Sequence, residues 1–293
     1  MKKAVFLIFM IICLVSVGVC GLKIYDYHRE EAKQEGEFDE IAKFVSVDPS
    51  GEDAQVQNPQ GDKDVNSENS KDKASSGTSS SNSNKGSSSS GENGTSDRIT
   101  TDTAGLNKLW NKNHDLIGWI SIPNTRVNYP VMQTKNSPNF YLKHNFSKQY
   151  SLYGVPYIEE ACDVNEPSDN LVIYGHHMNN GSMFAGLMKY KDESFFKNNQ
   201  YVYFNTLERE GTYQIVAVFK ATVNTGTSRD FPFYRFINAG EESQFNDYVK
   251  SCKSRALYNT GVEAKYGDKL ITLATCENSI ENGRLAIVAK RVN

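Results

Sequence analysis

The stretch Lys269-Leu270-Ile271-Thr272-Leu273-Ala274-Thr275-Cys276 decides the fold of this chain. It is rich in apolar and β-branched residues, which favours a largely buried β-strand with a thiol at its end. A second apolar strand, 285–292, follows after a polar turn at 277–283. If the two strands form an antiparallel hairpin, Arg284 at the start of the return strand lies close to Cys276. The pattern therefore predicts that a nucleophile and an anion-stabilising cation meet at this strand end.

A histidine occupies a similar position at the end of another apolar strand. Residues 170–175, Asn-Leu-Val-Ile-Tyr-Gly, run directly into His176. An unperturbed cysteine is mostly protonated at neutral pH, so a catalytic thiol needs a cationic neighbour. Of the five histidines, His176 is the best placed to pair with the Cys276 thiolate or to protonate a leaving amine. Three others lack this setting and are assigned to the surface or the core: His28, His114 and His144.

The chain after about residue 103 alternates short apolar runs with turn residues, which is typical of an all-β barrel or sandwich with a few helices. Eight strands are predicted, at 117–122, 127–132, 153–158, 171–174, 201–205, 213–223, 269–275 and 285–292. Apolar residues at helical spacing predict a short helix near 106–110, with Asp102 as its cap. The same spacing predicts a longer helix over 241–254, with Cys252 on its buried face.

The segment Thr272–Cys276, the downstream Arg284 and the triplet Tyr174-Gly175-His176 form a specific combination. Together they resemble the sortases, the cysteine transpeptidases that join proteins to the Gram-positive cell wall. Class B is the most similar, through residues 174–184, the segment 141–146 and the late helix. The resemblance covers roughly 104–293, the predicted catalytic domain. It implies a mainly β fold, the eight-stranded sortase β-barrel with a few peripheral helices.

The resemblance also implies a reaction and its residues. Cys276 would attack the carbonyl of a Thr in a C-terminal sorting motif of an exported protein, forming a thioacyl enzyme that is resolved by a peptidoglycan amine. His176, chosen over His177 because it follows the Tyr-Gly pair, would move the proton, and Arg284 would hold the oxyanion. Four residues are assigned to the peptide groove: Asn139, Leu142, Thr275 and Glu277. We expect Glu277 to face the groove or solvent, since an inward carboxylate would oppose a thiolate.

Other interpretations stay open at this point. One is a surface binding or scaffold module that kept the barrel, and another is a different cell-wall cysteine transpeptidase or a papain-like hydrolase. The L,D-transpeptidases place the cysteine in a His-Gly-Cys context, and papain-like enzymes place it at a helix start, ahead of the histidine. Here His176 precedes Cys276 and both follow predicted strands. The exact sorting motif, the accepting amine, and wall anchoring versus pilus assembly are not determined by the sequence.

The N-terminus predicts a membrane anchor. Ala4–Leu22 is an uninterrupted run of apolar and small residues, long enough to cross a hydrocarbon core of about 30 Å as a helix. We favour an uncleaved signal anchor at 1–24 over a cleaved signal peptide or a lipoprotein processed at Cys20, because the run is long and no clear cleavage site follows. This predicts a single-pass protein of the cell membrane, with a cytoplasmic N-terminus and an extracellular catalytic domain.

Two segments separate the anchor from the predicted domain. Residues 25–45 form a charged stalk, for which a short helix and a solvated linker are equally compatible with the sequence. Residues 46–103 are rich in Ser, Asn and Gly with almost no large apolar side chain. Such a segment cannot bury enough surface to offset its ordering entropy. We expect a disordered tether that holds the domain away from the membrane.

Charge and residue spacing exclude several other partners. The net charge of −3 and the lack of a dense basic patch argue against nucleic acid. The adjacent pair His176 and His177 does not indicate a metal site, because neighbours on an extended segment point to opposite faces and no further ligand stands nearby. We expect no metal, no organic cofactor and a monomeric enzyme.

The remaining cysteines are expected to be structural. Cys13 and Cys20 fall inside the predicted anchor, which leaves an odd number for the exported part and does not suggest a disulfide scaffold. Cys252 is assigned to a helix face in the core. Cys162 stands beside acidic residues, whose charges would disfavour a thiolate.

Overall fold

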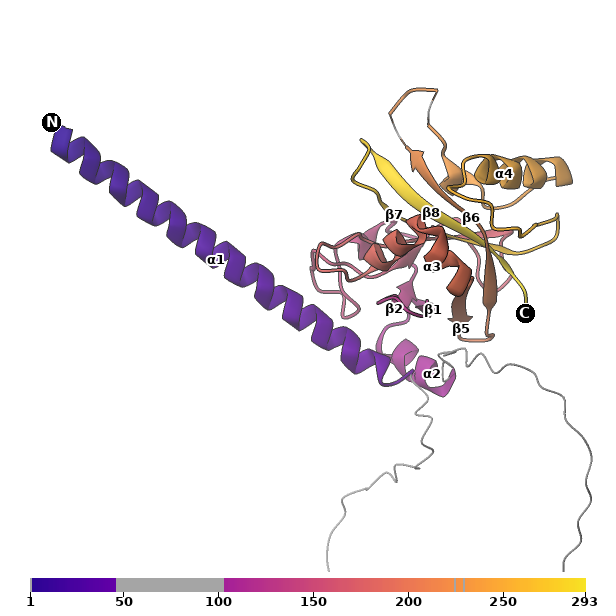
Figure 1. Ribbon diagram of the computed structural model, residues 1–293. Coiled ribbons are helices and arrows are strands. Elements are labelled where there is room, and N and C mark those ends of the chain that lie inside the picture. Colours follow the sequence, from indigo (N-terminus) through magenta and orange to yellow (C-terminus); the bar gives the residue numbers. More distant parts are fainter. Residues whose placement is uncertain (1, 46–102, 224, 229) are drawn as a thin grey trace, which may run out of the picture. The chain divides into compact units, whose positions relative to one another are not determined.

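Eight strands close into a barrel in the computed structural model, which describes residues 2–45 and 103–293 except 224 and 229 (Figure 1). The strands are β1 (Leu116–Ser121), β2 (Asn128–Met132), β3 (Tyr157–Ile158), β4 (Asn170–Tyr174), β5 (Tyr201–Thr206), β6 (Thr212–Thr222), β7 (Leu270–Cys276) and β8 (Gly283–Arg291). Their order around the barrel is β1-β2-β3-β4-β7-β8-β6-β5. The predicted eight-stranded barrel is confirmed.

Strand β7 is central to the arrangement. It pairs in parallel with β4, with Tyr174 opposite Ala274, and antiparallel with β8, with Cys276 opposite Arg284. All its residues up to Thr275 are buried, which explains why its sequence is nearly continuous in apolar and β-branched residues. The chain leaves β4 and returns to pair beside it almost a hundred residues later, so the two strands end at the same edge of the barrel.

Strand β3 is shorter than predicted, because the first half of the expected strand 153–158 is irregular. Gly154 has a positive φ of 58°, and a Cβ added there would lie 2.4 Å from the carbonyl oxygen of Tyr141. Pro156 has no N–H to donate to a neighbouring strand. The strand therefore begins at Tyr157, after the turn and the proline.

Helix α4 (Glu242–Ser254) covers the outer face of the barrel over β6 (Figure 1). Its buried side chains are those predicted from the helical spacing: Phe245, Tyr248, Val249 and Cys252. They form a second apolar core with Val216 and Phe219 of β6, while Ile215 and Val218 of β6 belong to the first, inside the barrel. Strand β6 is thus buried on both faces, which accounts for its long apolar run.

Shorter helices fill the connections. Helix α2 (Thr103–Lys112) is the predicted one near 106–110 and buries Leu106 and Leu109. Helix α3 (Glu193–Asn198) and the 3₁₀ helices Phe140–Leu142, Phe184–Lys191 and Phe233–Arg235 were not predicted. The predicted cap Asp102 and all of the predicted linker up to 102 lie outside the described residues.

Helix α1 (Lys2–Ala42) continues without a break from the apolar N-terminal segment through residues 25–42. Within the part of the chain that the structure describes, it is the single helix long and apolar enough to cross a membrane. It is therefore a candidate membrane anchor. Near its far end Phe38 and Ile41 are buried, as is Val45 just beyond, and all three belong to the main core.

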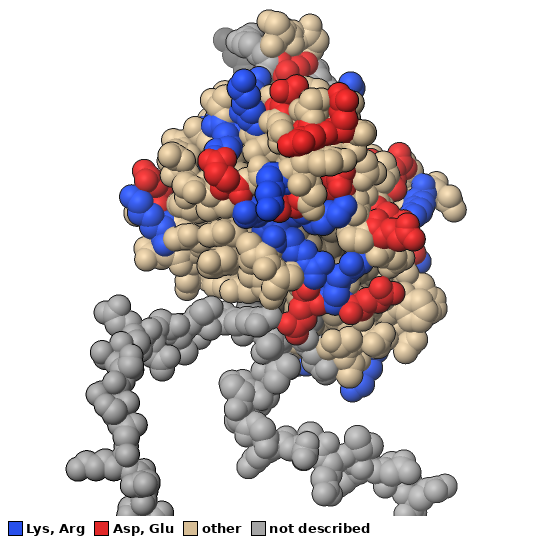
Figure 2. Space-filling view, turned by 90° about the vertical axis from the view of Figure 1, so that its right-hand side faces the viewer, with Lys and Arg blue, Asp and Glu red and all other residues tan. Residues whose placement is uncertain are grey.

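Charged side chains are mixed on the surface. On the face shown in Figure 2, basic side chains form a short band bordered by acidic ones, without an extended field of one sign. The sequence has 32 Lys and Arg against 35 Asp and Glu, which agrees with this balance. Such a surface is typical of an ordinary solvated domain.

Candidate active site

Cys276 and His176 leave the barrel at the same edge because they follow two paired parallel strands. The last pair in the register of β4 and β7 is Tyr174 with Ala274, and the N–H of Gly175 donates to the carbonyl of Ala274 at 3.1 Å. His176 and Cys276 each come two residues after that pair. Strand pairing alone thus brings the predicted histidine and cysteine together.

Arg284 reaches the same edge through the predicted hairpin, which is confirmed. Cys276 and Arg284 are directly opposite each other in the antiparallel register of β7 and β8. The turn between them is closed by a hydrogen bond from the N–H of Glu277 to the carbonyl of Gly283 at 3.0 Å. The Arg284 guanidinium donates to the carbonyl of Gly283 at 2.8 Å and is half-buried.

These three side chains share one cavity of about 470 Å³. Its lining consists of Asn139, Leu142, Tyr157, Glu159, Tyr174, Gly175, His176, Val223, Phe233, Tyr234, Ala274, Thr275, Cys276 and Arg284. The cavity combines a thiol, an imidazole and a guanidinium with apolar and aromatic walls. A site of this size and composition is suited to a short peptide segment.

Hydrogen bonds hold both the ring and the backbone of His176. The Nε2–H of the ring donates to the carbonyl of Leu142 at 2.7 Å, and the N–H of Phe184 donates to the carbonyl of His176 at 2.8 Å. A Cβ at Gly175 would lie 2.5 Å from the Phe184 ring, so glycine is needed at this position. His177 does not line the cavity, and its Nδ1–H donates instead to the carbonyl of Cys276 at 3.1 Å.

Three of the four predicted groove residues line the cavity. Asn139 adopts a left-handed conformation with φ of 63°, and its Oδ1 accepts a hydrogen bond from the Tyr157 hydroxyl at 2.8 Å. Leu142 contributes both its side chain and the carbonyl that holds His176. The Thr275 hydroxyl is buried and has no hydrogen-bond partner among the described residues.

Glu277 is not part of the cavity lining, and its expected orientation is corrected. Its side chain is 3% exposed and binds Lys191 at 3.2 Å and Lys220 at 3.5 Å. Burial would raise the pKa of Glu277, but hydrogen bonds from Ser279 and Lys191 and the charge of Lys220 lower the pKa to about 2. The two lysines make an inward carboxylate possible here, a compensation that spacing in the sequence did not reveal.

Two tyrosines and one glutamate line the cavity but were not among the site residues predicted from the sequence. The Tyr174 hydroxyl donates to Glu159 at 2.7 Å, and burial raises the pKa of both Tyr157 and Tyr174. Both hydroxyls therefore stay protonated as hydrogen-bond donors at neutral pH. Tyr174 directly precedes the Gly-His pair, so its place beside the site was a signal available in the sequence. Tyr157 and Glu159 gave no such signal, because β3 brings them there.

The other cysteines of the barrel are structural. Burial raises the pKa of Cys162 and of Cys252 to about 12. For Cys162 desolvation is the main cause and the neighbouring acidic charge of Glu159 adds less, which changes the reason inferred from the sequence. Within residues 2–45 and 103–293, no three His, Cys, Asp or Glu side chains gather as a metal site.

Comparison with known proteins agrees with this geometry. The sortase domain model matches residues 120–292. Sortase B of Listeria monocytogenes is 33% identical over 206 residues, which cover 68% of this chain and 80% of that protein. Sortase B of Staphylococcus aureus is 30% identical over 61% of this chain and 70% of its own length. The solved structure of Clostridium perfringens sortase B superposes with a TM-score of 0.56 at 30% identity, covering 64% of this chain and 99% of that one.

Proposed function

Because the chain belongs to the sortases, and within them to class B, we propose that Cys276 is its nucleophile, His176 its proton carrier and Arg284 its oxyanion-binding cation. The family establishes a cysteine transpeptidase that acts in anchoring proteins to the cell wall. The alternatives of a scaffold module or another class of cysteine transpeptidase are not favoured by this match.

In the acylation step, the Cys276 thiolate attacks the carbonyl carbon of the residue before the scissile bond, which we infer to be Thr. The S–C bond forms, the C–N bond breaks, and His176 gives a proton to the leaving amine. Arg284 stabilises the negative oxygen of the tetrahedral intermediate with a fixed, permanently charged donor. The products are a thioacyl enzyme and a released C-terminal fragment.

In the second step an incoming amine attacks the thioester. His176 removes the proton of that amine, an amide bond forms, and the Cys276 thiolate is released. We assign the amine to peptidoglycan and the acyl donor to an exported protein with a C-terminal sorting motif. The peptide would lie along the wall formed by Asn139, Leu142 and Thr275, whose hydroxyl lacks a partner among the described residues.

The observation that supports this assignment best is the shared cavity. Two strands from distant parts of the sequence and a hairpin partner converge on one opening, and each delivers a different chemical function. We also propose that α1 crosses the cell membrane once through Ala4–Leu22, with the N-terminus in the cytoplasm and the barrel outside. The enzyme would act there as a monomer without a cofactor.

Intact mass of the full chain in detergent micelles tests the proposal. The chain is incubated with a panel of peptides, including an Asn-Pro-x-Thr type, without an acceptor amine. An acyl adduct that maps to Cys276 and is absent from the Cys276→Ala variant is the expected result. An adduct that still forms in this variant, or formation at an unchanged rate in His176→Ala, would refute the assigned roles.

A further inference from the structure

The segment 176–184, here called the His176 loop, is a compact unit held by its own hydrogen bonds. His177 and Met183 face each other as an antiparallel bridge, and the base is closed by the bond from Phe184 N–H to the His176 carbonyl. At the tip, the N–H and the hydroxyl of Ser182 both donate to Oδ1 of Asn180, at 3.1 and 2.7 Å. A displacement of the tip is therefore transmitted to His176.

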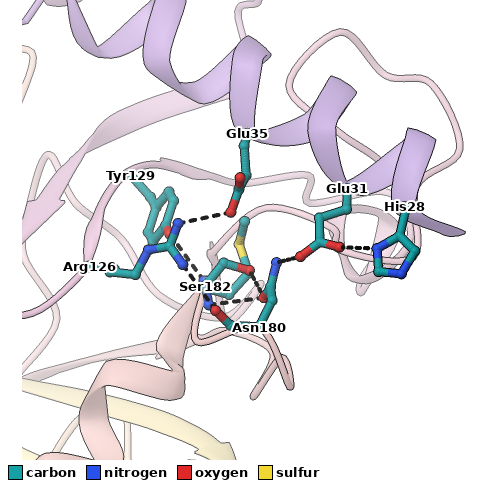
Figure 3. Close-up of polar contacts among 8 residues, drawn as sticks. His28, Glu31, Glu35, Arg126, Tyr129, Asn180 and Ser182 are labelled. Atoms are coloured by element: carbon teal, nitrogen blue, oxygen red, sulfur yellow. Dashed lines mark hydrogen bonds and ion pairs between the residues drawn. The ribbon is translucent and has the colours of Figure 1, made fainter.

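Helix α1 contacts this tip through hydrogen bonds (Figure 3). Nδ2 of Asn180 donates to Oε1 of Glu31 at 2.7 Å. The guanidinium of Arg126 donates to the Asn180 carbonyl at 2.9 Å and, from its other nitrogen, to Oε1 of Glu35 at 2.8 Å. The hydrogen bond from Asn180 is the largest of the influences that lower the pKa of Glu31, so this carboxylate stays ionised.

The same helix also contacts parts of the barrel outside the His176 loop. The Ser151 hydroxyl donates to the buried Gln34 at 2.8 Å, and the N–H of Ser147 donates to Glu37 at 3.1 Å. The Phe38 ring packs edge-on against Tyr129 at 5.1 Å. The Tyr129 hydroxyl in turn accepts the N–H of Met183 at 3.1 Å. Helix α1 thus has apolar packing and hydrogen bonds with the barrel in addition to its contacts with the His176 loop.

We propose that Glu31 and Glu35 of helix α1 are positioning residues for His176, so that transpeptidation depends on the membrane-proximal helix being docked on the His176 loop. The inference rests on the proposed role of His176. Exposed ion pairs such as Arg126 with Glu35 add little stability. Their effect here is on geometry, because a proton carrier acts only within hydrogen-bond reach of the leaving amine.

If α1 is docked on the barrel, the segment 46–102 does not set the distance between the barrel and the membrane anchor. The chain reaches the barrel through α1 before this segment begins, and returns through α2 after it ends. Both ends are close together, since a Cβ on Gly105 of α2 would collide with the carbonyl of Phe44 at 1.5 Å. The docked face of α1, rather than the length of 46–102, then sets how the barrel is held next to the anchor.

The full chain provides a matched pair of variants for the test. Glu31→Ala with Glu35→Ala removes two carboxylates of α1 that face the tip of the His176 loop and its neighbour Arg126. Glu30→Ala with Glu37→Ala removes two carboxylates of the same helix, which accept from the N–H groups of Leu152 and Ser147 instead. Both doubles change the net charge equally and remove contacts with the barrel.

Two measurements are made on the full chain in detergent micelles. Amide hydrogen exchange should become faster over 176–184 in the first double, and over 147–152 in the second. The acylation rate should fall by about threefold to tenfold in the first double with KM unchanged, because a misplacement of about 1 Å can cost up to about a hundredfold. Glu31→Gln keeps an acceptor oxygen for Asn180, so this single variant should keep most of the rate.

Unchanged exchange over 176–184 in the first double, or equal loss of rate in both doubles, would overturn the inference. If the wild-type chain forms no acyl enzyme with any peptide, the proposed function fails instead, while the exchange measurement still decides whether α1 holds the loop. The two failures are therefore distinguishable.

Discussion

The cavity at the end of β4 and β7 and the interface between α1 and the barrel are both polar, and both border an open volume, of about 470 Å³ and 260 Å³. They differ in the kinds of side chain that line them. Each has one buried hydroxyl without a partner among the described residues, Thr275 in the cavity and Tyr153 at the interface, but the cavity also gathers a thiol and an imidazole, which the interface lining lacks. At the interface, the buried Gln34 accepts from Ser151 and donates to Glu37.

The difference separates a cavity that holds reactive side chains from an interface whose side chains connect α1 to the barrel. Volume and unpaired hydroxyls do not distinguish them, whereas the thiol, imidazole and guanidinium that share the first cavity do. The two regions of thiol chemistry also differ, since Cys276 lines the cavity and Cys252 of α4 is completely buried. Substitutions and chemical probes should therefore act on chemistry in the first region and on stability or position in the second.

The largest expected effect is the selectivity of thiol labelling. Cys162 and Cys252 have their pKa raised to about 12, so about one thiol in ten thousand is ionised at about pH 8. Iodoacetamide should therefore label Cys276 in the folded chain, and the two buried cysteines only after denaturation. Peptide mass mapping checks this, and labelling of Cys252 as fast as Cys276 would remove the contrast between cavity and core.

The next effect separates two adjacent histidines. His176→Ala should slow acylation by about a hundredfold to ten thousandfold, as expected for loss of a general acid. His177→Ala loses one hydrogen bond to the Cys276 carbonyl, worth about 1 kcal/mol, and should slow acylation by about fivefold at most. Single-turnover formation of the acyl enzyme measures both rates. Equal losses would mean that lining the cavity does not identify the proton carrier.

If Arg284 has its proposed role, Arg284→Lys should lower kcat by about a hundredfold, because lysine keeps the charge but not the rigid fork of donors proposed to bind the oxyanion. Arg291→Lys is the matched control, since Arg291 ends the same strand β8 at the opposite side. Circular dichroism would show both variants folded. A control that loses as much activity as Arg284→Lys would point to strand β8, rather than the cavity, as the sensitive feature.

The smallest effect concerns stability at Glu277, which forms ion pairs like residues of the α1 interface although it is next to Cys276, the proposed nucleophile. At pH 7 the Glu277→Gln variant should lose about 1 to 3 kcal/mol of unfolding free energy. The reason is that folding lowers the pKa of the wild-type Glu277 carboxyl from 4.5 to about 2. The stabilisation is complete above 4.5 and disappears as pH falls through about 2.

Urea unfolding at several pH values measures this difference. The wild-type advantage should shrink steadily below about pH 4.5, because protonation of the carboxyl makes it resemble the amide. The exposed Glu281 lies in the same turn, and Glu281→Gln should change stability by less than about 0.5 kcal/mol. A pH-independent loss in Glu277→Gln would contradict the ion pairing with Lys191 and Lys220.

Local patterns in the sequence predicted much of the barrel. The apolar runs matched all eight strands to within a few residues except at β3, where Gly154 and Pro156 break the strand. The hairpin of β7 and β8 was predictable because its partners are close in the chain, so the predicted closeness of Arg284 to Cys276 is confirmed. The helical spacing around Cys252 likewise predicted the buried face of α4.

Contacts between distant segments were not predictable in this way. Tyr157 and Glu159 reach the cavity because β3 pairs with β4. Glu277 turns inward because Lys191 and Lys220 come from other elements to neutralise it. For residues 25–45 the sequence left helix and solvated linker equally open, since a charged stretch has no apolar face strong enough to decide between them.

From its own residues the chain determined the strands, the motif around Cys276 and the apolar anchor segment, because each depends on neighbours within a few positions. The folded arrangement determined which of these meet: β4 beside β7, Glu31 against Asn180, and Glu277 beside two lysines. The physical reason is that pairing register and the cost of burying a charge depend on partners far away in the chain.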